Sequence, residues 1–298
     1  MKFRSKISDV GSIQHLYRVL VTIGRLSDGN VLLRIAPARF CIFSKMSPTS
    51  GSCFVIADIK PDMLFDEFLM TGYASDANEI YLELKVDTLI QSLKIPSQKA
   101  KCLKIKLTNK AGPSLTVEAE LPSVVAASRR SVFDVPVQIV HRNLWASVTP
   151  AEEIPSSISC YMPPFKSLKA VVDRMRLTRQ HNLQLSVNKY GELRIRVGDN
   201  TEGYSACTRF PDIEFPEADD RHEPEQITDE EREEVQRKGE FYSSIVDLRT
   251  FAAFLTALQF PTTRMRCDVR HHKSLLFSMG TSDFCLRYFV PAVDSGNY

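Results

Sequence analysis

The sequence lacks the short motifs that mark common enzyme classes. No Gly-x-x-x-x-Gly-Lys-Ser/Thr loop, no Gly-x-Gly-x-x-Gly turn and no Gly-x-Ser-x-Gly elbow occurs in its 298 residues. Asp58 and Asp62 would make one acid pair, and Asp66 and Glu67 another, but neither pair has a nucleophile or ligand pattern nearby. We therefore interpret them as solvated carboxylates and expect no enzymatic activity. The alternative from another class is a hydrolase with a carboxylate or histidine site, which requires a pocket of converging polar groups.

Long apolar runs and paired cysteines are also missing. No run approaches the ~20 residues that cross a bilayer, and the first residues lack the apolar segment of a secretory signal. The seven cysteines are an odd number, with no Cys-x-x-Cys and no Cys/His set at zinc spacing. His271 and His272 follow a strand pattern and precede Lys273, which favours a hairpin turn over metal ligation. We expect a protein without membrane, metal or cofactor, with reduced and mostly buried thiols.

The charge of the chain is unevenly distributed. The formal net charge is +2, but residues 212–240 hold 13 acids and 4 bases, a local charge of −9 that leaves +11 for the remainder. The positive charge of the remaining residues is compatible with a polyanionic partner, although basic surfaces also occur in proteins that bind no nucleic acid. The acidic stretch predicts an insertion at about 211–239. A capping-box pattern at 228–231 indicates a short charged helix within it.

What the sequence does contain is one order of elements that occurs twice. Residues 1–7 alternate as a strand before an amphipathic helix near 12–26, and residues 157–162 do so before a helix near 165–179. In each half several strands follow, then a short helix at about 87–95 or 247–259, then three more strands. At 298 residues, with 43% apolar residues, two domains are expected. Strands of the first half are predicted at 30–35, 40–43, 53–59, 65–70, 80–84, 103–108, 115–121 and 131–140, and those of the second at 183–187, 193–197, 204–210, 241–246, 264–269, 275–278 and 284–290.

The last strand of each half carries a proline, at Pro136 and at Pro291. Proline has no N–H for a strand ladder, so it is typical of edge strands. An exposed edge must be protected or paired, and pairing with another subunit is one solution. The pattern therefore favours an oligomer.

The predicted helices bury an apolar stripe and expose basic side chains. In the first, Ile13, Leu16 and Leu20 fall on one face, while Gln14, Arg18, Thr22 and Arg25 share the opposite stripe. Across the outer faces of all four helices acids are few. This bias fits either ordinary surface charge or sequence-independent attraction to phosphates.

Residues 141–155 form the predicted connection between the halves. They include Pro150, Pro155 and two adjacent glutamates, a composition typical of a linker. Trp145 follows Leu144 within it. The tryptophan either anchors the linker on its own half of the chain or forms part of a docking surface for partners.

Taken together in chain order, these residues are similar to one known family. The similarity is carried by 1–7, 78–84, 103–110, 115–117, 134–136, Leu144, Trp145, Tyr161, Pro163, Lys166, Lys169, 171–172, Met175, 191–193 and 288–292. The chain resembles the Hus subunits of the heterotrimeric checkpoint sliding clamp, the nine-one-one complex, which is related to the replicative clamp PCNA. The resemblance spans nearly the whole chain, but the acidic insertion aligns poorly.

The resemblance implies an α+β fold of two tandem PCNA-like sliding-clamp domains, with antiparallel sheets outside and four helices lining the inner face. The expected divisions are 1–140, an interdomain connector at 141–155, and 156–298. The helices would face duplex DNA through Arg18, Arg25, Lys94, Lys166, Lys169, Arg176, Arg179 and Arg249. The ring would close through edge strands that contain Phe133, Val135, Val137, Tyr204, Ala206 and Thr208.

The same resemblance implies the partners. Two other clamp subunits would complete the ring, an ATP-driven clamp loader would place it on DNA, and DNA repair enzymes would be tethered to it, with Leu144 and Trp145 as the candidate docking residues. The expected location is the nucleus, and partly the cytoplasm before assembly. A homotrimeric replicative clamp is the alternative within this class.

Overall fold

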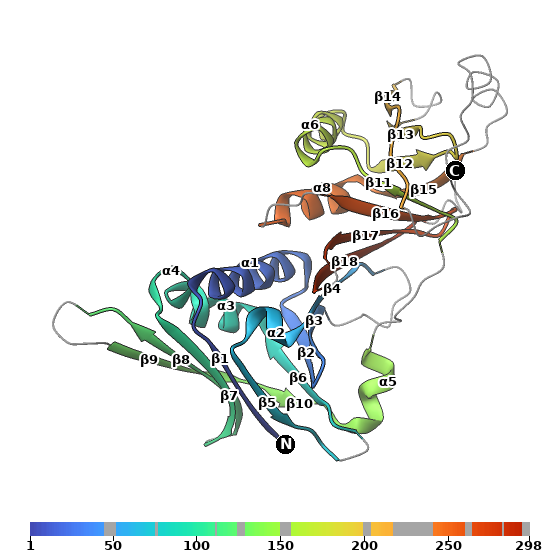
Figure 1. The fold of residues 1–298 in the computed structure, drawn as a ribbon. Helices are drawn as coiled ribbons and strands as arrows, with labels where there is room; N and C mark the ends of the chain where they lie inside the picture. The colour runs from blue at the N-terminus through green and yellow to red at the C-terminus, as the bar shows by residue number, and fades with distance from the viewer. Residues whose placement is uncertain are drawn as a thin grey trace.

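The computed structural model describes residues 1–44, 52–74, 77–110, 112–123, 129–149, 156–198, 204–216, 241–259, 264–281 and 283–293. The predicted capping box at 228–231, most of the acidic insertion, and Pro150 and Pro155 lie outside these residues. Within them the chain forms three antiparallel sheets with helices packed against them (Figure 1). No described helix meets the length and apolarity that a bilayer crossing requires.

The first sheet is built from the first half of the chain. Its strand order is β5-β1-β7-β8-β9. The strands are β1 (Lys2–Ile7), β5 (Glu67–Thr71), β7 (Cys102–Asn109), β8 (Pro113–Leu121) and β9 (Arg129–Pro136). The predicted alternation holds in β7, where Leu103 and Ile105 are buried and Lys104 and Lys106 are half-buried. β9 lies at one edge of this sheet.

The second sheet joins the two halves. Its order is β10-β6-β2-β3-β4-β18-β17-β16-β11, and the junction is the antiparallel pair β4–β18. From the first half come β2 (Asn30–Ala36), β3 (Arg39–Ser44), β4 (Phe54–Ile59), β6 (Ile80–Lys85) and β10 (Gln138–Ile139). From the second come β11 (Ile158–Tyr161), β16 (Met265–Arg270), β17 (Ser274–Gly280) and β18 (Phe284–Pro291). The halves therefore share one continuous hydrogen-bonded sheet.

The third sheet belongs to the second half alone, in the order β14-β13-β12-β15. Its strands are β12 (Asn182–Val187), β13 (Leu193–Val197), β14 (Ala206–Phe210) and β15 (Tyr242–Asp247). β14 is at one edge. One face of this sheet is apolar and buried, as shown by Leu183, Leu185 and Ile195, each fully buried.

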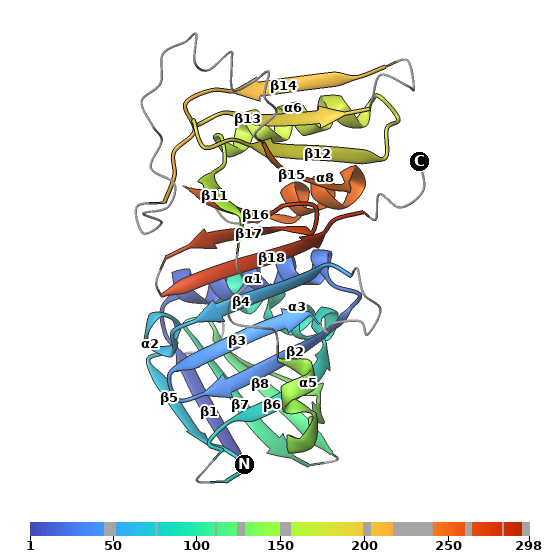
Figure 2. The ribbon, with the colours of Figure 1, turned by 90° about the vertical axis from the view of Figure 1, so that its right-hand side faces the viewer.

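The helices cover the inner faces of the sheets. They are α1 (Val10–Leu26), α2 (Pro61–Leu64), α3 (Val86–Lys94), α4 (Pro96–Lys99), α6 (Phe165–Arg176) and α8 (Leu248–Ala257). A 3-10 turn at Arg142–Leu144 and the short α5 (Trp145–Val148) lie in the predicted linker. In Figure 2 the nine-stranded sheet faces the viewer, with α5 in front of it and α1 and α8 behind.

Strand order confirms the internal repeat. In the first half the sheets contain β6-β2-β3-β4 and β1-β7-β8-β9, and in the second half β15-β12-β13-β14 and β11-β16-β17-β18. Each series has the same order and the same antiparallel pairing. Helices α1 and α3 correspond to α6 and α8 by their places in the chain. The prolines also match, because β9 ends at Pro136 and β18 ends at Pro291.

Local chemistry explains where the first helix begins and which face it buries. The Asp9 carboxylate accepts a hydrogen bond from the Ser12 backbone N–H at 2.7 Å, so α1 starts two residues before the predicted position. That bond lowers the pKa of Asp9. Ile13, Leu16 and Leu20 then line the buried face as the periodicity predicted.

Three predicted boundaries are wrong for physical reasons. The strand predicted at 131–140 is two strands in different sheets, because the chain leaves β9 at Pro136, which has no N–H to continue the ladder, and β10 then pairs with β6. The strand predicted at 65–70 begins only at Glu67, since the N–H of Phe65 closes the end of α2 by bonding the Pro61 carbonyl. The helix predicted to end at 179 ends at Arg176, because the next two N–H groups bond carbonyls three residues back and Arg179 has a left-handed backbone conformation.

All seven cysteines are free, and their surroundings differ. Cys41, Cys160 and Cys267 are buried, and burial raises the pKa of the first two thiols to about 12. Cys207 is exposed, so the prediction of burial does not hold for it. His271 and His272 lie in the turn of the β16–β17 hairpin, as predicted, and His271 Nδ1 accepts a hydrogen bond from the Ser243 N–H.

Candidate DNA-facing surface and subunit edges

Four helices form a continuous row on one side of the molecule. α1 packs against α3 within the first half, α6 against α8 within the second, and α1 meets α8 across the junction. In Figure 1 the row runs from α3 and α1 to α8 and α6, with the sheets on its other side. The row therefore presents the outer faces of four helices as one surface.

Seven of the eight predicted basic residues lie on these four helices, and Arg179 follows the end of α6. Lys169 is half-buried, and the other predicted side chains are exposed. Two residues of these four helices are acidic, Asp87 and Asp173. Asp173 approaches Arg176 at 4.0 Å with both side chains about half exposed, and such surface pairs contribute little. The row is therefore a predominantly positive surface.

Two of these cations sit where helix electrostatics disfavours them. Lys166 is the second residue of α6 and Arg249 the second residue of α8. The helix N-terminus carries partial positive charge, so a cation there costs a few tenths of a kcal/mol. Helix stability therefore does not explain why cations stand at these two positions.

Two residues predicted to lie on the exposed helix faces have other positions in the structure. Arg179 lies beyond the end of α6, in a left-handed backbone conformation with φ of 62°. Thr22 is fully buried rather than solvated. Its hydroxyl donates to the Arg18 carbonyl at 2.9 Å and accepts from the Gln259 N–H at 3.3 Å, so it belongs to the contact between the halves.

The two predicted edge strands are both at sheet edges, β9 in one sheet and β14 in another. Their named residues differ in exposure. Phe133 is 38% exposed, but Val135 is buried in the core and Val137 lies between β9 and β10, also buried. Tyr204 is half exposed and precedes β14, whereas Ala206 and Thr208 belong to β14 and are partly buried.

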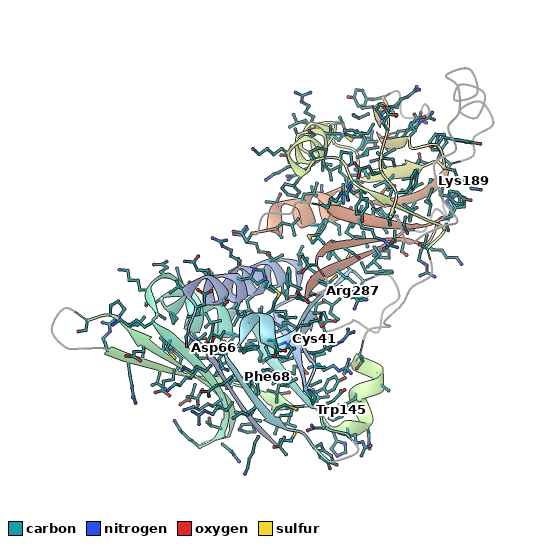
Figure 3. All side chains as sticks on the ribbon, viewed as in Figure 1. Cys41, Asp66, Phe68, Trp145, Lys189 and Arg287 are labelled. Atoms are coloured by element: carbon teal, nitrogen blue, oxygen red, sulfur yellow. The ribbon has the colours of Figure 1, made fainter. Side chains whose placement is uncertain are left out.

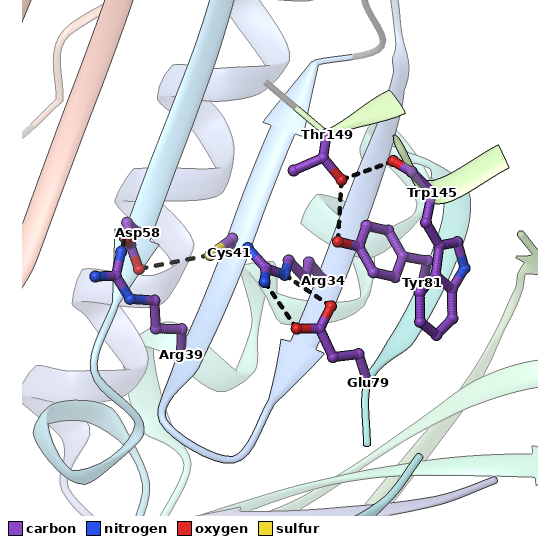
Figure 4. Close-up of polar contacts among 8 residues, drawn as sticks. All are labelled: Arg34, Arg39, Cys41, Asp58, Glu79, Tyr81, Trp145 and Thr149. Carbon is purple, nitrogen blue, oxygen red and sulfur yellow. Dashed lines mark hydrogen bonds and ion pairs between the residues drawn. The ribbon is translucent and has the colours of Figure 1, made fainter. Parts of the chain in front are cut away.

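The predicted linker is held on the outer face of the nine-stranded sheet. The Trp145 ring stacks on Tyr81 at a centroid distance of 4.7 Å, and its Nε1–H donates to the Val140 carbonyl at 3.1 Å. Thr149 Oγ1 bonds both the Trp145 carbonyl and the Tyr81 hydroxyl (Figure 4). Trp145 thus anchors the linker, while the adjacent Leu144 is 54% exposed.

An ion pair lies beside the aromatic stack. The Arg34 guanidinium makes two hydrogen bonds to the Glu79 carboxylate, at 2.7 and 3.0 Å, and lies 6.0 Å from the Tyr81 ring (Figure 4). The hydrogen bond from Arg34 lowers the pKa of Glu79. A carboxyl with a lowered pKa stabilises the fold above its unfolded pKa, and this contribution is lost as pH falls through the folded value.

Truncation of Trp145 tests the anchor. Trp145→Ala removes a half-buried ring and its hydrogen bond, so we expect the free energy of unfolding to fall by about 2 kcal/mol. Leu144→Ala is the matched control, and an exposed side chain should cost less than ~0.5 kcal/mol. Urea denaturation of both variants measures the difference. Equal effects would show that the ring does not hold the linker.

Sequence reasoning missed two groups of surface residues. Leu177, just after α6, is 82% exposed, and Ile95, just after α3, is 52% exposed. Arg194 and Arg209 lie directly opposite each other on β13 and β14. The alternation of arginine with apolar residues at 193–197 was the available signal for this second group.

Comparison with known proteins defines the class first. The fold is that of the PCNA sliding clamps: the chain superposes on PCNA from Entamoeba histolytica with a TM-score of 0.67 and 12% identity, covering 98% of each chain. For PCNA from Thermococcus kodakaraensis the TM-score is 0.64 and the identity 13%, covering 97% of this chain and 99% of that one. The predicted α+β clamp fold is therefore confirmed.

The particular family follows from sequence. The model of the Hus1-like protein family matches residues 1–294. Human checkpoint protein HUS1 is 33% identical over 295 residues, which cover 98% of this chain and all of the human protein. The chain belongs to the Hus1-like family.

Proposed function

We propose that this protein is a subunit of a heterotrimeric checkpoint sliding clamp that encircles duplex DNA. The observation that carries the proposal is the combination of a two-fold repeated clamp fold with whole-length similarity to human checkpoint protein HUS1. The homotrimeric replicative clamp is less favoured, because identity to the two PCNA chains is 12% and 13%, against 33% to the human checkpoint protein.

The internal repeat supports a specific ring contact. Within the chain, β18 of the second half pairs with β4 of the first half. The repeat equates β18 with β9 and β4 with β14. The same pairing between subunits would join the β9 edge of one subunit to the β14-equivalent edge of its neighbour. Such pairing satisfies two edges that otherwise expose backbone donors and acceptors.

Helix packing supports the same contact. Within the chain α1 meets α8, and the repeat equates these helices with α6 and α3. Leu177 is as far from the start of α6 as Thr22 is from the start of α1, and Thr22 is fully buried against the end of α8. Leu177 would therefore be buried against the α3-equivalent of a neighbouring subunit, and Ile95 against the opposite neighbour. This accounts for two exposed apolar side chains.

The basic helix row supports binding to DNA phosphates. Three such rows, one from each subunit of the ring, would surround a duplex, so each phosphate contact can be weak while the ring stays linked to DNA. The residues proposed to face DNA are Arg18, Arg25, Lys94, Lys166, Lys169, Arg176, Arg179 and Arg249. Their contacts would be sequence-independent.

The finer assignments follow from family membership. We propose domains at 1–140 and 156–298 joined by the connector at 141–155, no enzymatic activity, loading by a separate ATP-driven clamp loader, docking of repair enzymes, and a nuclear location. Leu144 remains available on the connector for docking, since it is exposed beside the anchored Trp145.

Native mass spectrometry of the chain purified alone and with co-expressed clamp-like proteins tests the proposal. The expected result is a one-to-one-to-one complex with two different partners. A homotrimer of the isolated chain would favour the replicative clamp. A stable monomer that ignores both partners would contradict any ring assignment.

A further inference from the structure

A cluster of arginines lies on the sheet face opposite the helix row. Side chains on β12, β13 and β14 point alternately to the two faces of the sheet. Leu185, Ile195 and the residues two positions away from each face the core, and the residues between them face outward. The outward residues line a cavity of about 350 Å³. Its lining residues are Gln184, Ser186, Arg194, Arg196, Ser205, Cys207, Arg209 and Phe241. Among the described residues that line the cavity, three carry a guanidinium group and none carries a carboxylate.

The register of the β13–β14 pair places two positive charges side by side, which costs free energy of folding. Arg194 and Arg209 are directly opposite in the β13–β14 pair, an arrangement that destabilises a sheet. Arg194 is partly compensated by Glu192, which accepts hydrogen bonds of 2.7 and 3.3 Å from it. Arg209 is exposed and forms no ion pair with any residue that the structure describes. A bound anion would compensate this charge.

The Arg194 guanidinium that lines the cavity is held in a fixed orientation by its neighbours. The Arg194 guanidinium stacks on the Phe241 ring at 4.1 Å, and Glu192 holds two of its nitrogens. The hydroxyl of Ser186 and the amide of Gln184 add donors from β12, and the hydroxyl of Ser205 adds one from the residue before β14. Donors that converge from three strands suit the three oxygens of a phosphate monoester better than a planar carboxylate.

A second hollow adjoins the first. It has a volume of about 260 Å³, and Arg209 lines both. Tyr190 and Pro211 give the second hollow apolar surface. A free phosphate ion would use only the arginine cavity, whereas a peptide would also occupy the neighbouring hollow with a side chain beside the phosphorylated residue.

We propose that this outer face binds a phosphorylated serine or threonine in a peptide segment of a partner protein. The arginine cavity takes the phosphate, and the Tyr190–Pro211 hollow takes an adjacent residue. The site is on the sheet face away from the helices, so it would stay accessible while the helix row holds DNA. The inference does not require the ring to be heterotrimeric.

Fluorescence anisotropy with a labelled heptapeptide that contains one phosphoserine tests this inference on the full-length protein in its native assembly. We expect the phosphopeptide to bind and the unphosphorylated peptide not to bind. Arg209→Gln should weaken binding by about tenfold to a hundredfold, because a hydrogen bond between charged groups is lost. Lys189→Gln is the matched control, since Lys189 is exposed on the same half (Figure 3) but lines neither hollow. This substitution should leave binding unchanged.

Several results would contradict phosphopeptide binding at this cavity. Equal binding of the two peptides, or unchanged binding by Arg209→Gln, would overturn the proposal. Loss of peptide binding in Lys169→Glu but not in Arg209→Gln would place the peptide on the helix row and overturn it as well. Binding that appears only when residues 217–240 are replaced by a short neutral linker would assign the cavity to the acidic segment of this chain. None of these results bears on the stoichiometry of the ring.

Discussion

Replacing Leu177 by glutamate is expected to prevent assembly of the ring while leaving the subunit folded. The side chain is 82% exposed in the single chain, so the substitution removes no contact within the fold. At the equivalent position of the first half, Thr22 is fully buried where the two halves meet. A charge in the matching contact between subunits would be buried without a partner, which is strongly unfavourable. We expect the assembly to weaken by at least about a hundredfold.

Size-exclusion chromatography with light scattering measures this effect on co-expressed subunits. Leu69→Glu is the control, because Leu69 is 61% exposed on β5, an edge strand that the repeat does not place at a subunit contact. Its complex should remain intact, and circular dichroism of both variants should match the parent. An intact ring with Leu177→Glu would show that the neighbour does not cover this side chain.

Reversing three charges on α6 is expected to produce the second large effect. Lys166→Glu, Lys169→Glu and Arg176→Glu together change the sign of the α6 surface, whose only acid is Asp173. If each cation meets one phosphate, the plot of log affinity against log salt should become shallower by about 2.7, at ~0.9 per contact. We expect duplex affinity near 100 mM salt to fall by about tenfold or more.

A charge-matched control separates this effect from net charge. Lys2, Lys189 and Lys273 are exposed on strands or turns away from the helices. Their reversal to glutamate changes the net charge equally, so the salt slope should stay near that of the parent. Filter binding over a salt series on the assembled ring measures both variants. Equal losses in the two triple variants would indicate attraction to the whole surface and would remove α6 from the DNA contact.

Much of the fold could be predicted because its signals are local. The alternation of apolar residues in β7 and the apolar stripe of α1 each predict which face is buried. The repeat of strand and helix patterns predicted the order of elements in both halves. The break at Pro136 was missed because the residues on both sides continue to favour extended structure. Only the tertiary structure places β10 beside β6, away from β9.

The candidate surfaces were less predictable because they depend on distant residues. The basic helix faces follow from helical periodicity, but Thr22 was misassigned since its burial comes from Gln259, more than 200 residues away. The sequence left two roles for Trp145, an anchor for the linker or part of a docking surface. Its contacts with Tyr81 and Val140 show that it anchors the linker. Arg194 and Arg209 belong to strands that pair only in the folded sheet, so their proximity depends on register.

An electron cryomicroscopy map of the co-purified assembly with a short duplex would show directly whether this chain is part of a ring around DNA. We predict a closed ring of three different subunits in which α1, α3, α6 and α8 of this chain face the duplex, and β9 and β14 pair with the two neighbours. A map with these helices on the outer rim, or with the β9 and β14 edges left unpaired in a closed particle, would contradict it.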